Sequence, residues 1–214
     1  MENLNKYIDQ TLLSPSATKA EVMAFLRDVS KYEFYAAVVN PCWVSFARQT
    51  LAKDIKVCSV VGFPLGASTT KAKVYAVQDL IAMGCDEIDM VLNIGQLRSG
   101  DFKYVEEEIK AVVDAAQERI VKVIIETCLL ELNEKQIAAR IIKNTGAHYV
   151  KTSTGFSNDG ARVEDVVLLR EVVGPEFGIK ASGGIRDRVF AIELIKTGAN
   201  RIGTSAGVQM VNSG

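Results

Sequence analysis

Two lysines in the last third of the chain occupy positions where lysine is unusual. Lys151 ends the apolar segment 148–151 (HYVK), and Lys180 ends the segment 178–180 (GIK). Both segments resemble strands of a parallel sheet, which are covered on both faces, whereas lysine is among the residues least often buried. Desolvation and a nearby like charge lower the pKa of an amine, and a neutral amine can form a Schiff base with a carbonyl compound. The two lysines therefore suggest imine chemistry.

Acidic residues in comparable positions could take part in this chemistry or simply neutralise the lysines. Asp89 lies within a predicted strand, while Asp9 and Glu126 end two others. A carboxylate with a perturbed pKa is typical of an active site, but structural ion pairs perturb pKa values too. A buried salt bridge to Asp89 or Glu126 is therefore the structural alternative for each lysine. The residue types alone leave both interpretations open.

The elements that must position these residues follow a repeating pattern. A helical pattern ends in a glycine, a small residue and an apolar run at three places, which begin at Gly84, Gly146 and Gly198. Glycine just past a helix end supplies a left-handed cap, and the next strand of an α/β unit begins within a few residues. Side-chain N-caps of helices are predicted at Thr18, Asp101, Asn133 and Asp187.

Eight strand-like runs are separated by seven plausible helical connections. The predicted strands are 7–9, 36–39, 57–61, 87–91, 122–126, 149–151, 178–181 and 201–203. Alternating strands and helices indicate an α/β fold with a parallel sheet. Eight evenly spaced units favour a closed (β/α)8 barrel over an open doubly wound sheet. We therefore predict one barrel domain over residues 1–214, with the site at the C-terminal ends of the strands.

Glycine-bearing loops after the last strands predict a phosphate site. Segments 183–186 (GGIR) and 203–207 (GTSAG) follow predicted strands seven and eight. Barrels often bind phosphate at these two loops through backbone donors, although glycine also serves ordinary turns. The residues expected to contact substrate or phosphate are Asp9, Thr11, Thr154, Gly155, Gly183, Gly184, Arg186, Gly203 and Ser205.

Composition argues against several other classes of protein. The formal net charge of −1 and the scattered acids and bases speak against a nucleic-acid surface. The four cysteines lack Cys-x-x-Cys spacing and are predicted to be reduced core residues of an intracellular protein. His148 is the single histidine and lies at a strand start, so neither a catalytic triad nor a His-rich metal site is expected.

The location of the protein is also predicted from patterns that the chain lacks. Residues 1–9 show no signal-peptide pattern. No apolar run approaches the roughly 20 residues that cross a bilayer. We expect a cytoplasmic protein without a membrane partner.

Motifs along nearly the whole chain resemble those of the deoxyribose-phosphate aldolase family, class I aldolases on (β/α)8 barrels. The matching segments are 7–13 (YIDQTLL), 39–41 (VNP), 61–66 (VGFPLG), 86–91 (DEIDMV), 122–127 (KVIIET), 150–156 (VKTSTGF) and 180–186 (KASGGIR). The last two are the most specific.

The resemblance implies a function and roles for three residues. The reaction would be the reversible cleavage of 2-deoxy-D-ribose 5-phosphate to acetaldehyde and D-glyceraldehyde 3-phosphate, in deoxyribonucleotide catabolism. Lys151 matches the family's Schiff-base lysine, and Lys180 matches the second lysine, which depresses the pKa of its neighbour. Asp89 matches the aspartate that works with Lys180 and a water in proton transfer. Neither a metal nor an organic cofactor is implied.

Some positions depart from the family pattern, and other functions remain as alternatives. Gln10, Ser14 and Val38 stand where His, Lys and Cys respectively are common, which bears on fine substrate recognition. The alternatives are another Schiff-base phosphosugar aldolase of the transaldolase type, a phosphosugar isomerase barrel, and a non-catalytic phosphometabolite-binding protein. The expected partners are a small phosphosugar and a second copy of the chain in a homodimer.

Overall fold

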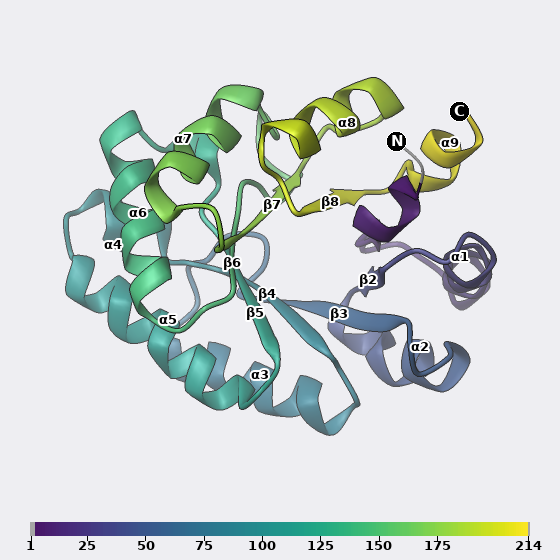
Figure 1. Cartoon of the computed structure of the whole chain (residues 1–214). Helices are drawn as coiled ribbons and strands as arrows, with labels where there is room; N and C mark the ends of the chain where they lie inside the picture. The colour runs from purple at the N-terminus through teal and green to yellow at the C-terminus, as the bar shows by residue number, and fades with distance from the viewer. Residues whose placement is uncertain (1–2, 214) are drawn as a thin grey trace.

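Eight parallel strands form a closed barrel in the order of the chain (Figure 1). The computed structural model describes residues 3–213, so positions 1, 2 and 214 of the predicted domain lie outside the described residues. The strands are β1 (Ile8–Leu12), β2 (Ala36–Val39), β3 (Lys56–Val61), β4 (Glu87–Val91), β5 (Ile120–Ile124), β6 (Tyr149–Lys151), β7 (Gly178–Ser182) and β8 (Arg201–Thr204). Pairing of β1 with β8 closes the sheet, which confirms the predicted barrel and excludes the open sheet.

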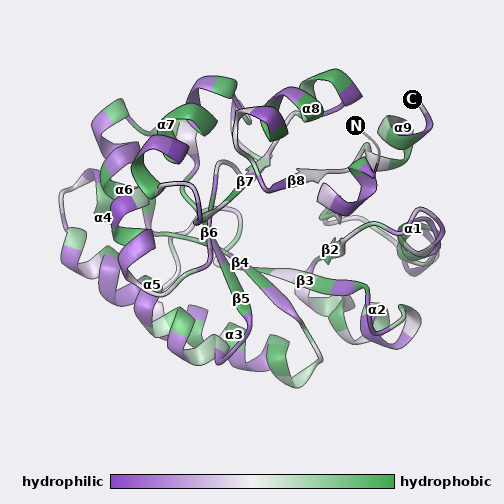
Figure 2. Cartoon of the chain, in the orientation of Figure 1, coloured by the Kyte–Doolittle hydropathy of each residue, from purple (hydrophilic) through white to green (hydrophobic). Residues whose placement is uncertain are grey.

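Helices surround the barrel, as Figure 1 shows. They are α1 (Lys19–Lys31), α2 (Val44–Thr50), α3 (Thr70–Ala82), α4 (Ile94–Arg98), α5 (Phe102–Ala116), α6 (Leu132–Asn144), α7 (Val163–Val173), α8 (Arg188–Thr197) and α9 (Gly207–Asn212). Short 3₁₀ segments are η1 (Leu4–Tyr7), η2 (Pro41–Trp43) and η3 (Thr127–Leu129). The longer helices carry both hydrophobic and hydrophilic residues (Figure 2), as expected where one face packs on the barrel.

Two strand boundaries differ from the prediction in ways that affect the site. β1 continues to Leu12, so Asp9 lies inside the strand and does not end it. β5 ends at Ile124, and Glu126 lies beyond it with a φ of 53°. A left-handed residue turns the chain out of the extended ladder. The apolar run before Glu126 contains no signal for this turn.

The predicted helix caps are confirmed at three of four positions. Thr18 forms a capping box with Glu21, and Asp101 and Asp187 each accept a hydrogen bond from a backbone N–H two or three residues into the helix. The N-cap predicted at Asn133 is wrong. The N-cap lies two residues earlier, at Glu131, whose backbone N–H donates to Oε2 of Glu134 at 2.7 Å, as in a capping box.

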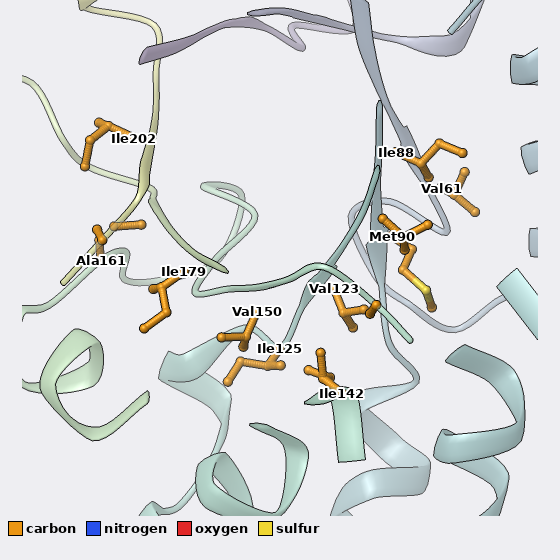
Figure 3. Close-up of a cluster of buried hydrophobic side chains, with 14 of the residues drawn as sticks. Val61, Ile88, Met90, Val123, Ile125, Ile142, Val150, Ala161, Ile179 and Ile202 are labelled. Atoms are coloured by element: carbon orange, nitrogen blue, oxygen red, sulfur yellow. The ribbon is translucent and has the colours of Figure 1, made fainter. Parts of the chain in front are cut away.

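Alternation along the strands separates a helix-facing apolar layer from a charged barrel interior. Ile88 and Met90 of β4 belong to the main apolar core, whereas Glu87 and Asp89 between them do not. Successive side chains of a strand point to opposite faces, so the two carboxylates share the inner face. Figure 3 shows part of the apolar core between barrel and helices, in which strand residues such as Ile88, Met90 and Val150 are drawn together with Ile142 of α6.

The structure also bears on the predicted state of the cysteines and on the predicted absence of a membrane-spanning helix. All four cysteines are free. Only Cys58 and Cys85 are buried, whereas Cys42 is exposed and Cys128 half-buried, so the predicted core location is wrong for these last two. Within residues 3–213, the helices are all too short or too polar to cross a membrane.

Candidate active site

Asp89 lies at the centre of the charged interior and is fully buried. Its Oδ2 accepts hydrogen bonds from Nζ of Lys151 and Nζ of Lys180, each at 2.7 Å. Its Oδ1 accepts from Nζ of Lys122 at 2.9 Å. Lys151 and Lys180 are direct partners in the β6–β7 register, as Asp89 and Lys122 are in the β4–β5 register. Because partners in adjacent parallel strands face the same side, four strands bring these groups to one point.

A second group of ionised side chains lies beside this centre. Lys180 Nζ is 2.6 Å from Asp9 Oδ2, and Arg201 is paired with both Asp9 and Glu87. Glu87 Oε2 is also 2.6 Å from Lys122 Nζ. We call the whole group of ion-paired side chains the barrel network. It contains the three carboxylates Asp9, Glu87 and Asp89 and the four cations Lys122, Lys151, Lys180 and Arg201.

Three members of the barrel network were not among the predicted site residues. In the prediction, Glu87, Lys122 and Arg201 are each the first residue of a strand. A charged side chain at a strand start can be exposed to solvent, so these residues were not expected in the site. The structure buries all three. The prediction looked for charged residues at the C-terminal ends of strands and therefore passed over these three at the starts.

The surroundings of the two predicted lysines shift their pKa values in opposite directions. Burial lowers the pKa of Lys151, and the positive charge of Lys180 adds to this effect against the opposing effect of Asp89. Burial also acts to lower the pKa of Lys180, but the carboxylates of Asp89 and Asp9 outweigh it and raise the value. Lys151 is therefore the better nucleophilic amine, while Lys180 stays a cation.

The carboxylates of the barrel network are held in their ionised forms. Burial opposes ionisation of Asp9, but Arg201 and Lys180 lower its pKa to about 2. Burial likewise opposes ionisation of Asp89, but its lysine neighbours lower its pKa well below the usual range. Opposite charges within hydrogen-bonding distance account for both shifts.

A cavity of about 390 Å³ opens above Lys151 at the C-terminal ends of the strands. Lys151 lines it together with eight of the residues predicted to contact substrate, namely Thr11, Thr154, Gly155, Gly183, Gly184, Arg186, Gly203 and Ser205. Asp9 is not among the lining residues, because Arg201 and Lys180 enclose it. Asp89 and Lys180 also lie beneath the cavity lining. The predicted loops therefore surround the cavity that Lys151 lines, whereas Asp9 does not contribute to the cavity surface.

Thr154 uses its hydroxyl within the protein. The hydroxyl donates to Glu126 and accepts from the backbone N–H of Phe156 at 3.0 Å. The backbone N–H of Thr154 donates to Glu126 Oε1 at 3.2 Å. Burial raises the pKa of Glu126. Within residues 3–213, the ion pairs do not include Glu126, so it holds the loop after β6 instead of neutralising a lysine.

The opposite side of the barrel mouth is apolar. Leu13, Val38, Cys58 and Val60 form a separate buried cluster on which Phe63 packs. Phe63 in turn meets the ring of Phe156 edge to face, at 5.2 Å between centroids. Leu13 is the member of this cluster that lines the cavity, so the polar, glycine-bearing loops after β6 to β8 face Leu12 and Leu13 at the end of β1.

The described residues also bear on whether a side-chain cluster of the usual kind could hold a metal ion. Residues 3–213 contain no group of three or more His, Cys, Asp or Glu side chains that could hold a metal ion. His148 is exposed, precedes the first residue of β6 and accepts a hydrogen bond from the N–H of Val121 through Nδ1, whereas the cavity lies at the other end of that strand, at Lys151.

A closed parallel barrel whose mouth holds a lysine of lowered pKa, beneath glycine-bearing loops, is the arrangement of an aldolase-type lyase. Comparison with known proteins agrees. The model of the DeoC/LacD family of aldolases matches residues 4–210. The chain belongs to this family, which confirms the resemblance drawn from its motifs.

Individual aldolases are similar to this chain in sequence and in structure. A deoxyribose-phosphate aldolase of Clostridium botulinum is 52% identical over 97% of this chain and 99% of its own length. The solved structure of the aldolase QR15 has a TM-score of 0.96 at 38% identity, covering 100% of this chain and 96% of that one. The tetrameric deoxyribose phosphate aldolase from Aeropyrum pernix has a TM-score of 0.89 at 34% identity, covering 98% of this chain and 90% of that one.

Proposed function

We propose that this aldolase cleaves 2-deoxy-D-ribose 5-phosphate reversibly to acetaldehyde and D-glyceraldehyde 3-phosphate through a Schiff base on Lys151. The observation that carries the proposal is the position of Lys151. It lines the cavity, while its Nζ lies 2.7 Å from an aspartate that also binds Lys180. The names of the relatives support the choice of substrate.

The first half of the reaction forms the imine and breaks the carbon–carbon bond. The neutral amine of Lys151 attacks C1 of the open-chain aldehyde, and loss of water gives a protonated imine. The C2–C3 bond then breaks, and its electrons move to the imine nitrogen, which forms an enamine on C1 and C2. The C3 hydroxyl loses its proton, so that C3 becomes the aldehyde carbon of glyceraldehyde 3-phosphate. The protonated imine is the electron sink that this cleavage requires.

The second half returns a proton and releases acetaldehyde. The enamine takes a proton at C2, and water then hydrolyses the imine and frees Lys151. We assign the acid and base roles to Asp89 and Lys180, because Asp89 contacts both lysines through one oxygen atom. Lys180 lies beneath the cavity lining, so protons exchanged with it pass through the Asp89 carboxylate or a water molecule against it.

The two sides of the barrel mouth fit the two ends of this substrate. Loops 183–186 and 203–207 line the cavity with backbone groups and the exposed Arg186, which suits a phosphate. Leu12 and Leu13, which line the same cavity, offer an apolar contact for the small two-carbon donor. Holding the phosphate at one side orients the C2–C3 bond over Lys151.

The decisive experiment is borohydride trapping with acetaldehyde, followed by peptide mass mapping. We expect a reduced two-carbon adduct on the peptide that contains Lys151, none in Lys151→Ala, and normal labelling in the control Lys110→Ala, whose lysine is exposed on α5. A folded wild-type protein without an adduct would contradict the imine mechanism. Trapping with a different donor but not with acetaldehyde would indicate a transaldolase-type reaction.

Further parts of the proposal concern the pathway, the location, the domain organisation and the oligomeric state. A role in deoxyribonucleotide catabolism, a cytoplasmic location, a single domain over residues 1–214 and a homodimer all stay predictions. Equilibrium ultracentrifugation tests the last of these, with a monomer or tetramer as the contradicting result.

A further inference from the structure

We infer that Gln10 is a positioning residue that holds the loop after β8 in its phosphate-binding shape and so makes the enzyme selective for phosphorylated substrates. The inference rests on the proposed function, since it concerns the phosphate side of the same cavity. Gln10 itself does not line this cavity.

The side chain of Gln10 bridges two points of the loop. Its Nε2 donates to the carbonyl oxygen of Ser205, and its Oε1 accepts from the backbone N–H of Gly207, each at 3.1 Å. Gln10 is only 5% exposed. A buried amide needs partners for both its donor and its acceptor, and this loop supplies one of each. The contacts join β1 to residues almost 200 positions later in the chain.

The fit between Gln10 and the loop is close. A Cβ atom at position 207 would overlap Gln10 Oε1 and lie 3.0 Å from the ring of Phe34, so only glycine allows this approach. Gln10 follows Asp9 on β1 and therefore faces the opposite side of the strand from the barrel network. It supports the loop from the helix side of the barrel.

The same loop is tied to the other predicted phosphate loop. The hydroxyl of Thr204 donates to the carbonyl of Ile185 at 2.6 Å and accepts from the N–H of Ala206 at 2.9 Å. Ile185 directly precedes Arg186. Gln10 thus fixes Ser205 and Gly207, while the adjacent Thr204 links the same loop to the loop after β7.

This arrangement has a consequence for binding. Ser205 is exposed to the cavity, and Gln10 fixes the direction of its carbonyl and hence of the peptide groups on either side. Without Gln10 the loop must be ordered when phosphate binds, and that ordering costs free energy. Binding of the phosphate should therefore weaken, whereas imine formation on Lys151 should not change.

Steady-state kinetics on two substrates test the inference. With 2-deoxyribose 5-phosphate, we expect Gln10→Leu to raise KM roughly tenfold, the effect of about one lost hydrogen bond. With unphosphorylated 2-deoxyribose, kcat/KM should stay at the wild-type value. Gln10→Glu keeps the shape but turns a carboxylate oxygen toward the Ser205 carbonyl, so its KM should rise at least as much. Gln78→Leu, at an exposed glutamine on α3, is the matched control.

Calorimetric titration with inorganic phosphate adds a readout that needs no turnover. Both Gln10 variants should bind phosphate about tenfold more weakly than wild type, whereas Gln78→Leu should bind it normally. Gln10→His should recover part of the affinity, because a neutral imidazole has one donor and one acceptor.

The outcomes separate this inference from the proposed function. A folded Gln10→Leu or, should that variant not fold, a folded Gln10→Glu with wild-type phosphate affinity and KM would overturn the inference alone. An equal loss of activity on both sugars would also overturn it, because that result indicates a general structural role. Wild-type protein that cleaves neither sugar would overturn the proposed function.

Discussion

The protein buries lysines in two regions, and the comparison shows what distinguishes a reactive lysine from a structural one. Lys73 of α3 is 1% exposed and lies outside the barrel, where Nζ contacts the carbonyl oxygens of Gly66 and Val91 and Oε2 of Glu108, each at 2.8 Å. Lys151 lies inside the barrel mouth. Burial lowers the pKa of both lysines, so a lowered pKa does not separate them.

The two regions differ in charge balance and in access. Lys73 has three N–H donors and three acceptors around it, and its charge is matched by that of Glu108. The barrel network has one more cation than carboxylates, and Lys151 alone among its members lines the cavity. A buried lysine becomes a candidate nucleophile when excess positive charge favours its neutral form and a substrate can reach it.

The strongest test of this comparison removes the proposed nucleophile. Lys151→Ala should lower kcat by roughly 10⁴-fold or more, because the covalent step cannot occur. A coupled assay for glyceraldehyde 3-phosphate measures the activity, and far-UV circular dichroism checks the fold. Substantial residual activity in a folded variant would remove Lys151 from its role.

The second test removes the charge that links the lysines. Asp89→Asn should slow turnover by about 10²–10⁴-fold, the usual effect of a lost acid or base. Single-turnover kinetics with deuterated solvent would report on the proton-transfer steps. Activity close to wild type would show that Asp89 only neutralises its neighbours.

The third test addresses the structural lysine. Lys73→Met leaves Glu108 buried without its partner and should destabilise the protein by about 3–5 kcal/mol in urea unfolding. The double variant Lys73→Met/Glu108→Leu should recover much of this loss. Residual kcat of folded Lys73→Met should stay within about tenfold of wild type, in contrast to Lys151→Ala. A loss of activity as large as that of Lys151→Ala would end the distinction between the regions.

The smallest expected effect is a displaced pH profile. The rate of borohydride trapping should rise with pH as Lys151 loses its proton, because only the neutral amine attacks. Lys180 lowers the pKa of Lys151, so Lys180→Met should move this rise to higher pH. Lys110→Met is the control for a distant surface charge. An unchanged or lower midpoint in Lys180→Met would contradict the proposed tuning.

The fold was predictable because it depends on local signals. Each βα unit carries its own apolar run, and Thr18, Asp101 and Asp187 mark helix starts by side chains that bond to nearby N–H groups. The prediction was wrong where competing local signals lay close together. At α6, Glu131 and Glu134 cap the helix in place of Asn133.

The sequence pointed to residues that the structure brings together, but it predicted their contacts only in part. Charge in an apolar strand drew attention to Lys151, Lys180 and Asp89, and the family resemblance then suggested their roles. The same sequence gave no reason to pair Glu126 with Thr154 or to enclose Asp9 between Arg201 and Lys180. Strands covered on both faces lack a polar side, so alternation cannot tell which residues point inward.

The eight βα units, the family and the lysines at the strand ends could all be inferred from the amino-acid sequence. Those properties are encoded in short segments, where residue type and spacing act locally. Three other features became visible in the folded barrel: three lysines share Asp89, Lys151 is the one of them that lines the cavity, and Gln10 contacts the loop after β8. These contacts join strands distant in sequence, and they arise because closure of the barrel fixes the register between neighbours and turns alternate side chains toward a common axis.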